Sequence, residues 1–433
     1  MPKTNSIWID TAKKNKFKAL KGDAKTDVLI IGGGIAGILT AYMLTKAGIE
    51  CILLEADKIC SGITKNTTAK ITVQHGLIFN KMIKRYGHIT AKMYLEAQRD
   101  ALEKYRKLCS DIPCDFEEQT SYVYSRKNKQ KIEDEAAALK SLGCPVLVSS
   151  KTSLPFAATA VGIEGQAQFN PLKFLFGIAK ELPIFENTKV LEMGDNTAVT
   201  SFGTISFKRA VVATHFPIIN KHGGYFLKLH QHRSYVLALE NAAEVDGMYV
   251  DEDIKGMSFR SYNGALLLGG GSHRTGKSGG GWRELESFAA EHYKDYKIIN
   301  RWATQDCMTL DDIPYIGQYS AATSNLYVAT GFNKWGMTSS MVAASLLTDI
   351  LKGKETDYAE VFSPSRSILY PKLFENAAES IIGLITPTKP RCPHMGCALK
   401  YNRAEHSWDC PCHGSRFSAD GELIDNPATD DKK

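Results

Sequence analysis

The chain has 433 residues, of which 43% are hydrophobic and 23% charged, with a formal net charge of +6. These values are ordinary for a globular protein of two or three domains. The positive charge is spread along the chain, which argues against a nucleic-acid-binding surface, and no run of about 18 apolar residues predicts a transmembrane segment. The N-terminal residues lack the apolar core of a signal peptide, so we expect a cytoplasmic protein.

Residues 1–26 carry seven lysines and two acidic residues. Such a segment is typical of a solvated, loosely ordered arm. Within it, we expect Trp8 to pack back onto the body of the protein as an aromatic anchor.

Residues 27–55 predict a strand, a glycine-rich turn, a helix and a second strand. The apolar run at the start is typical of a buried parallel strand, and Gly32, Gly34 and Gly37 follow it as G-x-G-x-x-G. In a dinucleotide-binding fold the first glycine allows the turn, the second admits a pyrophosphate and the third lets the helix pack on the strand. Glu55 ends the second strand, where its carboxylate could accept a hydrogen bond from a ribose hydroxyl. The alternative is a glycine-rich turn in some other α/β domain.

A polar loop rich in hydroxyl side chains follows, over residues 61–72, and includes Ser61, Thr67 and Thr68. Because ligands of a dinucleotide fold bind at the carboxyl ends of the strands, we expect this loop to meet a cofactor. The alternative is a solvent-exposed loop of turn-forming residues.

The middle of the chain alternates between helices and strands. Helical spacing dominates residues 77–142, interrupted by a strand at 121–124, and the charged helix 129–141 ends at Gly143. A strand and a helix meet at Pro171. The apolar strand 209–215 ends at Ala213 and Thr214, a small-residue end that suits a sheet beside a nucleotide.

Residues 230–275 have a different character, because they alternate as strands joined by short turns. Asn263-Gly264 is a strong signal for a two-residue hairpin. This pattern predicts an antiparallel sheet and therefore a second domain. Further on, residues 326–338 run from a strand into a glycine-punctuated loop, from Gly331 to Gly336, and then into a helix whose N-terminus could face a cofactor.

These motifs together resemble the FAD-dependent oxidoreductases of the D-amino-acid oxidase-like family, over roughly residues 5–360. The resemblance rests on the N-terminal glycines, the Ala213-Thr214 strand end, residues 312–317 and the loop 331–336. It implies an α/β fold in which a Rossmann-like FAD-binding domain carries an antiparallel-sheet substrate domain. It also implies oxidation of an amine or amino acid by hydride transfer to the flavin, which carries the chemistry.

The resemblance assigns FAD-binding roles to a set of loop and strand-end residues: Gly32, Gly34, Ala36, Gly37, Glu55, Ser61, Thr67, Thr68, Ala213, Thr214, Gly331, Gly336 and Met337. We expect the FAD-binding domain to be discontinuous, over residues 1–85, 155–222 and 305–362. The substrate domain then takes 86–154 and 223–304. A proline-broken linker with one short helical piece is expected over 363–391, and a small C-terminal lobe over 392–433.

The C-terminal lobe contains a Cys-x-His box, Cys392 and His394, and a Cys-x-x-His box, Cys410 and His413. Two thiolates can hold one iron and two imidazoles the other, which is the ligation of a Rieske [2Fe–2S] cluster. A zinc site is the alternative, although the six candidate ligands here exceed the four that zinc needs.

Two further cysteines, Cys397 and Cys412, lie one in each of the two loops that carry these boxes. The run Cys-Pro-Cys-His-Gly-Ser resembles the Rieske proteins of respiratory and photosynthetic cytochrome complexes, and that resemblance implies a disulfide between Cys397 and Cys412. Those proteins carry Ser and then Tyr after the last box, whereas here Ser415 is followed by Phe417. One hydrogen-bond donor to the cluster is lost, so we expect a potential below the top of the Rieske range.

The lobe is too small to bury an adequate core alone, so we expect it to dock on the flavoprotein body. The sequence then predicts a dehydrogenase in which FAD takes electrons from an amine or amino-acid-like substrate and the cluster passes them singly to an external acceptor. Two alternatives are an electron-transfer protein without a small organic donor and an oxygen-using oxidase with a structural cluster. Three residues are weak catalytic candidates, His75, Arg260 and Tyr262, of which Arg260 could bind a substrate carboxylate.

Overall fold

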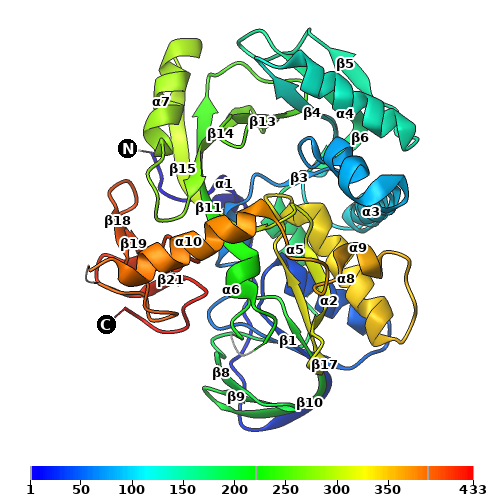
Figure 1. Ribbon diagram of the computed structural model, residues 1–433, viewed down its shortest axis with the longest axis vertical. Helices are drawn as coiled ribbons and strands as arrows, with labels where there is room; N and C mark the ends of the chain where they lie inside the picture. Colours follow the sequence, from blue (N-terminus) through cyan, green and yellow to red (C-terminus); the bar gives the residue numbers. More distant parts are fainter. Residues whose placement is uncertain (1, 220–221, 388–389, 433) are drawn as a thin grey trace.

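The computed structural model describes residues 2–219, 222–387 and 390–432. The expected domain ranges also include residues 1, 220–221, 388–389 and 433, which lie outside the described residues. Figure 1 shows a lower part built on β1, β10 and β17, an upper part built on β4, β13 and β14, and a small sheet at one side beside helix α10. None of the described helices is both long and apolar enough to cross a bilayer.

The lower part is an eight-stranded sheet in the order β16-β17-β10-β1-β2-β7, extended by β9 and β8. Strands β17, β10, β1, β2 and β7 pair in parallel. The apolar run that predicted β1 is buried in the middle of this sheet. The strands are β1 Ala24–Ile31, β2 Cys51–Leu54, β7 Ile184–Phe185, β8 Val190–Met193, β9 Thr197–Thr200, β10 Gly203–Val212, β16 Tyr315–Ser320 and β17 Thr323–Thr330.

Helices α2 and α8 pack against each other, and their buried hydrophobic residues share a core with Val28 and Ile30 on one face of β1. Each begins immediately after a parallel strand and its glycine turn, so both helix N-termini lie at the carboxyl edge of the sheet. The smaller helices of this part are short connections. The helices are α1 Ile7–Thr11, α2 Ile35–Lys46, η1 Ile63–Asn66, α5 Pro171–Ala179, α6 Tyr225–Lys228, α8 Gly336–Leu351 and α9 Ala359–Phe362.

The upper part is a nine-stranded sheet in the order β15-β11-β14-β13-β12-β4-β6-β3, with β5 paired to β6. All its pairs are antiparallel except β12 with β4. The expected Asn263-Gly264 turn joins β13 to β14, and both of its residues have positive φ, as a two-residue hairpin requires. The strands are β3 Lys70–Ile71, β4 Glu117–Ser125, β5 Leu147–Ser149, β6 Thr159–Gln168, β11 Leu229–Glu240, β12 Met248–Asp251, β13 Ser258–Tyr262, β14 Ala265–Arg274 and β15 Lys297–Thr309.

Three helices accompany this sheet: α3 Ile78–Ser110, α4 Lys129–Ser141 and α7 Gly281–His292. The bounds of α4 are those expected from its charge pattern. Helix α3 is kinked at Gly87, whose φ of 83° is not helical.

The structure differs from the expected domain boundaries at three strands. Strands β3 and β6, assigned to the FAD-binding domain, pair in the upper sheet, where β6 lies against β4. Strand β15 runs from 297 to 309, through the boundary expected at 304–305. Pairing with distant strands sets these memberships, and local sequence patterns do not record such pairing.

The described part of the N-terminal arm exposes its seven lysines, as a solvated segment should, but it packs on the body more closely than expected. Trp8 in α1 is fully buried and its indole N–H donates to the Thr67 carbonyl over 2.7 Å. The backbone of Lys3 forms an isolated parallel β-bridge with Asn300 of β15. The anchoring role expected of Trp8 is confirmed, and the arm as a whole packs on both parts of the molecule.

The C-terminal lobe is a four-stranded antiparallel sheet, preceded by helix α10, Pro371–Ile385, within the expected linker. Figure 1 shows α10 crossing the front of the molecule from the lobe toward α9. The strands are β18 Lys400–Asn402, β19 Ser407–Asp409, β20 Arg416–Ser418 and β21 Leu423–Asp425. The small core of the lobe contains four cysteines together with Leu399, Phe417 and Ala428.

The lobe docks on the body, as expected, through buried ion pairs. Arg233 of β11 pairs with Glu405, and its guanidinium lies 3.9 Å from Asp425. Arg416 of β20 binds Glu405, Asp425 and Asp409 at 2.8 to 3.0 Å. Burial opposes the charge of both carboxyls, but the two arginines hold the pKa values of Glu405 and Asp425 below their usual range.

Candidate functional site

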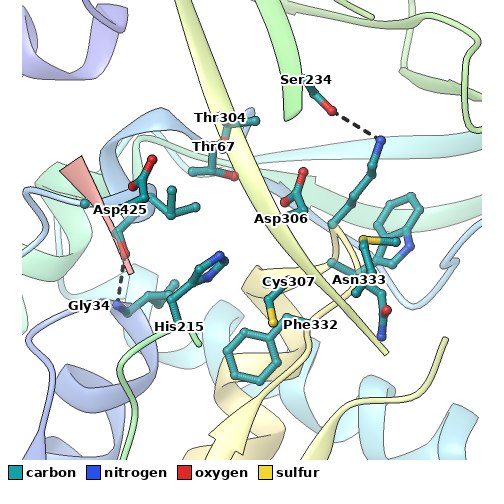
Figure 2. A pocket seen from close by; sticks show the side chains of 18 of the residues that line it. Gly34, Thr67, His215, Ser234, Thr304, Asp306, Cys307, Phe332, Asn333 and Asp425 are labelled. Carbon is teal, nitrogen blue, oxygen red and sulfur yellow. Dashed lines mark hydrogen bonds between the residues drawn. The ribbon is translucent and has the colours of Figure 1, made fainter. Parts of the chain in front are cut away.

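A cavity of about 800 Å³ is lined by residues of both sheets and of the C-terminal lobe (Figure 2). The parallel sheet contributes the ends of β1 and β2, the antiparallel sheet contributes β11 and β15, and the lobe contributes β21 and the residues after it. Asp425 and His215 come from the lobe and the body, and both lie on the same side of this space (Figure 2). The lobe is therefore part of the cavity wall.

The three fingerprint glycines have separate geometric roles. Gly32 has φ of 109°, and a Cβ there would stand 2.6 Å from the Ala213 carbonyl. A Cβ on Gly37 would stand 1.9 Å from the Gly32 carbonyl, so this glycine serves the packing of α2 on the turn. Gly34 faces the cavity, and the nearest heavy atom to a Cβ there would be Oγ1 of Thr64 at 3.3 Å. The turn therefore leaves room for a phosphate beside the N-terminus of α2.

Glu55 closes this turn from the second strand. Its Oε2 accepts from the Gly33 amide over 2.7 Å and its Oε1 accepts from the Asp57 amide over 2.9 Å. Burial raises the pKa of the carboxyl, and both backbone bonds oppose that rise. Each oxygen keeps a further lone pair for a ligand hydroxyl on the cavity side.

The expected FAD-binding residues that line the cavity are Gly32, Gly34, Ala36, Glu55, Ser61, Thr67, Thr68, Ala213, Thr214, Gly336 and Met337. Gly37 and Gly331 do not line it. Gly331 has φ of 72°, and a Cβ there would stand 2.3 Å from the Thr309 side chain, so its role is in the turn before α8. The donor set fits a dinucleotide, since the N-termini of α2 and α8 and several hydroxyl side chains line the same cavity.

Two of the three catalytic candidates lie outside the cavity, which corrects the expectation. Arg260 is fully buried, donates to the carbonyls of Thr68 and Ala69, and lies under the Trp8 ring. Tyr262 donates to Asp115 over 2.6 Å, and burial raises its pKa to about 12. Neither residue lines the cavity, and Nε and Nη2 of Arg260 are buried without a partner among the described residues.

His75 lines the cavity, but its ring is committed to the protein. Its Nδ1 lies 2.6 Å from the Tyr94 hydroxyl, its Nε2 lies 2.9 Å from the Thr72 carbonyl, and the ring stacks on Trp335. Burial lowers its pKa to about 3. These contacts indicate a structural imidazole rather than a catalytic base.

Lys334, Asp306 and Lys70 are among the ionisable residues of the cavity wall that the sequence analysis did not identify. The Lys334 ammonium donates to the hydroxyls of Ser234 and Ser272 at 3.2 and 3.1 Å. Asp306 lies nearby on β15, as Figure 2 shows. Burial lowers the pKa of Lys334 and raises that of Asp306, while the opposite charge of each residue opposes the shift of the other.

The loop that carries Lys334 is held in an unusual conformation. Asn333 and Lys334 both have positive φ, of 51° and 71°. Such a pair needs support, which comes from the Asn333 side chain: it accepts from the Thr309 amide over 2.8 Å and donates to the Gly331 carbonyl. The sequence analysis had already identified the loop 331–336 as a cofactor loop, and a lysine within it was the one sequence feature that pointed to Lys334.

Lys70 lies on β3, and its ammonium donates to Thr68 over 3.2 Å. Burial, assisted by the charge of Arg260, lowers its pKa to about 7. The end of β12 and the loop that follows it add three acidic residues to the lining, Asp251, Glu252 and Asp253. The cavity thus has acidic residues on this loop and both signs of charge elsewhere in its wall.

The second centre is formed by two loops with matching backbone geometry. The Cys392 amide donates to Cys397 and the Cys410 amide donates to Ser415, each over 2.8 Å. Gly396 and Gly414 close the loops by donating back to Cys392 and Cys410, and both glycines have positive φ. Each loop therefore begins at a cysteine held in the same way, while the histidine is the third residue of the first loop and the fourth of the second.

The expected ligands converge. The rings of His394 and His413 lie with centroids 5.0 Å apart, and Cys392 and Cys410 are buried beneath them. Nδ1 of His413 is buried and has no hydrogen-bond partner among the described residues. Two buried thiols, two neighbouring imidazoles set edge-on and a buried ring nitrogen without a partner fit a Rieske cluster.

The remaining cysteines lie close together as well. The Sγ atoms of Cys397, Cys410 and Cys412 lie within 4.8 Å of one another, and no disulfide is formed in the structure. Helix α10 covers Cys397 and Cys412, because its residue Gly383 lies against both of them. The proximity allows the disulfide that the resemblance implies, and that disulfide remains a prediction.

The second ligand loop is bonded to the antiparallel sheet through its carbonyls. Arg274 of β14 donates to Pro411 and Cys412 at 3.2 and 3.1 Å. Gln231 donates to the His413 carbonyl over 3.0 Å, and Gln305 donates to the Gly414 carbonyl over 2.9 Å. Four successive carbonyls of the loop are thereby satisfied by the sheet that also forms the cavity.

Comparisons with known proteins match this arrangement. The model of the family described as FAD dependent oxidoreductase matches residues 27–350, and that of the Rieske [2Fe-2S] domain matches residues 380–432. A Bacillus subtilis (strain 168) protein named as a Rieske 2Fe-2S iron-sulfur protein, YhfW, is 34% identical over 98% of this chain and 96% of its own length.

Two further comparisons concern the body of the molecule. Gamma-glutamylputrescine oxidoreductase of Escherichia coli (strain K12) is 22% identical over 81% of this chain and 89% of its own. The crystal structure of L-proline dehydrogenase from P. horikoshii superposes with a TM-score of 0.68 at 17% identity, over 79% of this chain and 98% of that one. The last likeness is one of fold.

Proposed function

The chain belongs to the FAD-dependent oxidoreductase family and carries a Rieske [2Fe–2S] domain, and we propose that it is a dehydrogenase for an amine or amino-acid-like substrate whose electrons leave singly through the cluster. The observation that supports this proposal best is the shared wall. Residues 423–426 of the cluster-bearing lobe line the cavity that holds the expected FAD-binding residues. Such contact suits electron exchange between two centres within one polypeptide.

The charges of the cavity support an amine or amino-acid-like substrate. Acidic residues on the β12–β13 loop attract a cationic amine, and Asp306 lies inside to receive it. Lys334, held by two hydroxyls and by no carboxylate among the described residues, is available to a carboxylate. The name of the Escherichia coli relative, an oxidoreductase of gamma-glutamylputrescine, is that of an enzyme for an amine-bearing substrate.

FAD, when bound, supplies the acceptor for a hydride from the substrate carbon next to nitrogen. The residues of this chain then orient the substrate and manage its proton. A neutral amine is the better hydride donor, and Lys70, whose pKa is lowered to about 7, lies in the wall where it could accept a proton. Each substrate releases two electrons, and an external one-electron acceptor must take them in two steps because the cluster carries one at a time.

Anaerobic mixing of the purified protein with a panel of amines and amino acids tests the proposal. We expect bleaching of the flavin absorbance, followed by the electron paramagnetic resonance (EPR) signal of a reduced cluster. Bleaching without that signal would favour an oxidase with a structural cluster. If no donor bleaches the flavin, but dithionite reduces the cluster and the flavin and the two exchange electrons, the result would favour an electron-transfer protein.

The variants Asp306→Asn and Lys334→Met localise the substrate. Each removes one charge from the wall while FAD contacts elsewhere remain. We expect the concentration of donor needed for half-maximal bleaching to rise at least tenfold, which corresponds to about 1.4 kcal/mol of lost binding. An exposed charge outside the cavity, changed in Lys255→Met, is the control.

A further inference from the structure

We propose that Gln231 is a positioning residue that couples the cofactor cavity to the cluster ligand His413 through His215. The inference rests on the proposed function, since it concerns the route by which electrons pass from flavin to cluster. Gln231 lies on β11, between the cavity and the second ligand loop. Nothing in its local sequence marks it, because its partners come from four separate segments.

The Gln231 amide is fully engaged. Its Oε1 accepts from Gln305 over 2.7 Å and lies 3.1 Å from Nε2 of His215. Its Nε2 donates to the carbonyls of His413 and Asn426 at 3.0 and 2.9 Å. Two donors and two acceptors exhaust the capacity of a side-chain amide, so this side chain has one orientation.

That orientation fixes the state of His215. Because Oε1 is an acceptor, Nε2 of His215 must carry a proton and donate it. His215 lines the cavity, and its φ of 66° places it in the left-handed region. The Thr330 hydroxyl, which donates to the His215 carbonyl, supports this conformation. A chain of two hydrogen bonds thus joins a cavity-wall imidazole to the backbone of a cluster ligand.

The residue after His215 makes a second contact along the same line. The ring of Phe216 is fully buried and meets the rings of His394 and His413 edge-on, with centroids 6.3 and 6.4 Å away. Asn426 clamps this segment by donating to the carbonyls of Thr214 and Phe216. The segment that follows β10 therefore runs from the cavity wall directly to both imidazoles.

Close packing leaves no slack between Gln231 and the loop. A Cβ on Gly414 would stand 2.6 Å from Cβ of Gln231, so the loop can approach this far only because residue 414 is glycine.

Each transfer moves one electron from the reduced flavin to the cluster, and two transfers return the flavin to its oxidised form. The two protons leave from the flavin and the substrate amine, and the electrons pass on to the one-electron acceptor.

The test compares Gln231→Met, which keeps the side-chain length and removes all four hydrogen bonds, with the parent protein. Flavin is reduced photochemically under anaerobic conditions, and cluster reduction is followed by absorbance and EPR. Photochemical reduction needs no amine substrate, so failure of the proposed substrate class does not affect the result. Failure of the parent's cluster to accept electrons from flavin would instead contradict the proposed function.

We expect the rate of cluster reduction in Gln231→Met to fall about tenfold, the effect of losing buried hydrogen bonds that hold one centre against the other. Iron content and cluster midpoint potential should match those of the parent. Gln305→Met is the matched variant, because it removes the bonds to Gly414 and to Oε1 of Gln231 and leaves the His215–Gln231 and Gln231–His413 bonds in place. Its rate should stay close to that of the parent.

An unchanged rate in Gln231→Met would overturn the inference, as would an equal fall in Gln305→Met. Loss of iron in proportion to the fall in rate would overturn it as well, because Gln231 would then only hold the lobe together. Gln318→Met, an exposed glutamine on β16, controls for the substitution itself.

Discussion

A Cβ atom on Gly383 would stand 2.4 Å from Sγ of Cys412. Helix α10 can therefore lie over the two extra cysteines only because this position has no side chain. We expect Gly383→Ala to lower the free energy of unfolding by about 1–3 kcal/mol through overpacking, although alanine favours a helix. Thermal denaturation and iron analysis measure the effect.

The control for this variant is Glu375→Ala, an exposed change on the same helix. It should leave both the melting temperature and the iron content unchanged. Equal stability of Gly383→Ala and the parent would show that α10 does not lie on the cysteine pair as described.

The ion-pair cluster at Arg233 predicts how firmly the lobe is held. Arg233→Met would leave the buried carboxylates Glu405 and Asp425 with Arg416 alone, which should destabilise the docked lobe by about 3–5 kcal/mol. Limited proteolysis should then release the lobe while the flavin absorbance persists. Arg403→Met, an exposed arginine of the lobe, should resist proteolysis as the parent does.

Buried His75 predicts a loss of stability in acid. Its pKa is about 3 in the folded protein and 6.5 when exposed, so between these values the unfolded chain binds more protons. The contribution of His75 to the free energy of unfolding is fully present above about pH 6.5. It is lost as the pH falls below that value, by roughly 1.4 kcal/mol per pH unit. Urea denaturation at pH 5 to 8 should show this slope, and His75→Gln should reduce it. The exposed change His88→Gln should preserve the slope.

How much of this site was accessible from sequence depends on how local each signal is. The fingerprint glycines and the two Cys-His boxes each lie within a dozen residues, and their spacing reports the chemistry directly. Asp306 and Lys334 share one site because β15 and the loop before α8 meet in space, which no spacing records. Glutamine hydrogen bonds across strands, such as those of Gln231, leave no sequence pattern.

The error at Arg260 has a specific physical cause. Strand alternation places Arg260 on the same face as Ser258, which does line the cavity. The N-terminal arm then covers the end of that face with Trp8. A lysine-rich segment expected to be loosely ordered thus decides which arginine a substrate can meet.

Phe417 stands where the cytochrome-complex Rieske proteins carry tyrosine, and it is fully buried in the core of the lobe. Phe417→Tyr should restore a hydrogen bond toward the cluster and raise its midpoint potential. A bond worth about 1 kcal/mol corresponds to roughly 40 mV for one electron. A redox titration checks this shift, with Tyr401→Phe, an exposed tyrosine of the same lobe, as the control. A lower potential in Phe417→Tyr would contradict the assignment.

The four additional cysteine variants separate ligands from the expected disulfide. Cys392→Ser and Cys410→Ser should lose iron and visible cluster absorbance. Cys397→Ser and Cys412→Ser should retain iron when purified but lose about 2–4 kcal/mol of stability if the disulfide forms. Complete loss of iron from Cys412→Ser would refute the ligand assignment, and recovery of zinc in place of iron would favour a zinc site.

Burial of the cluster ligands has a consequence for biogenesis. Cys392, Cys410 and His413 are each no more than 2% exposed once α10 and the antiparallel sheet enclose them. We therefore expect iron and sulfide to enter before α10 and the antiparallel sheet close over these three ligands. Iron-starved cells should then accumulate a yellow protein with an open, protease-sensitive tail.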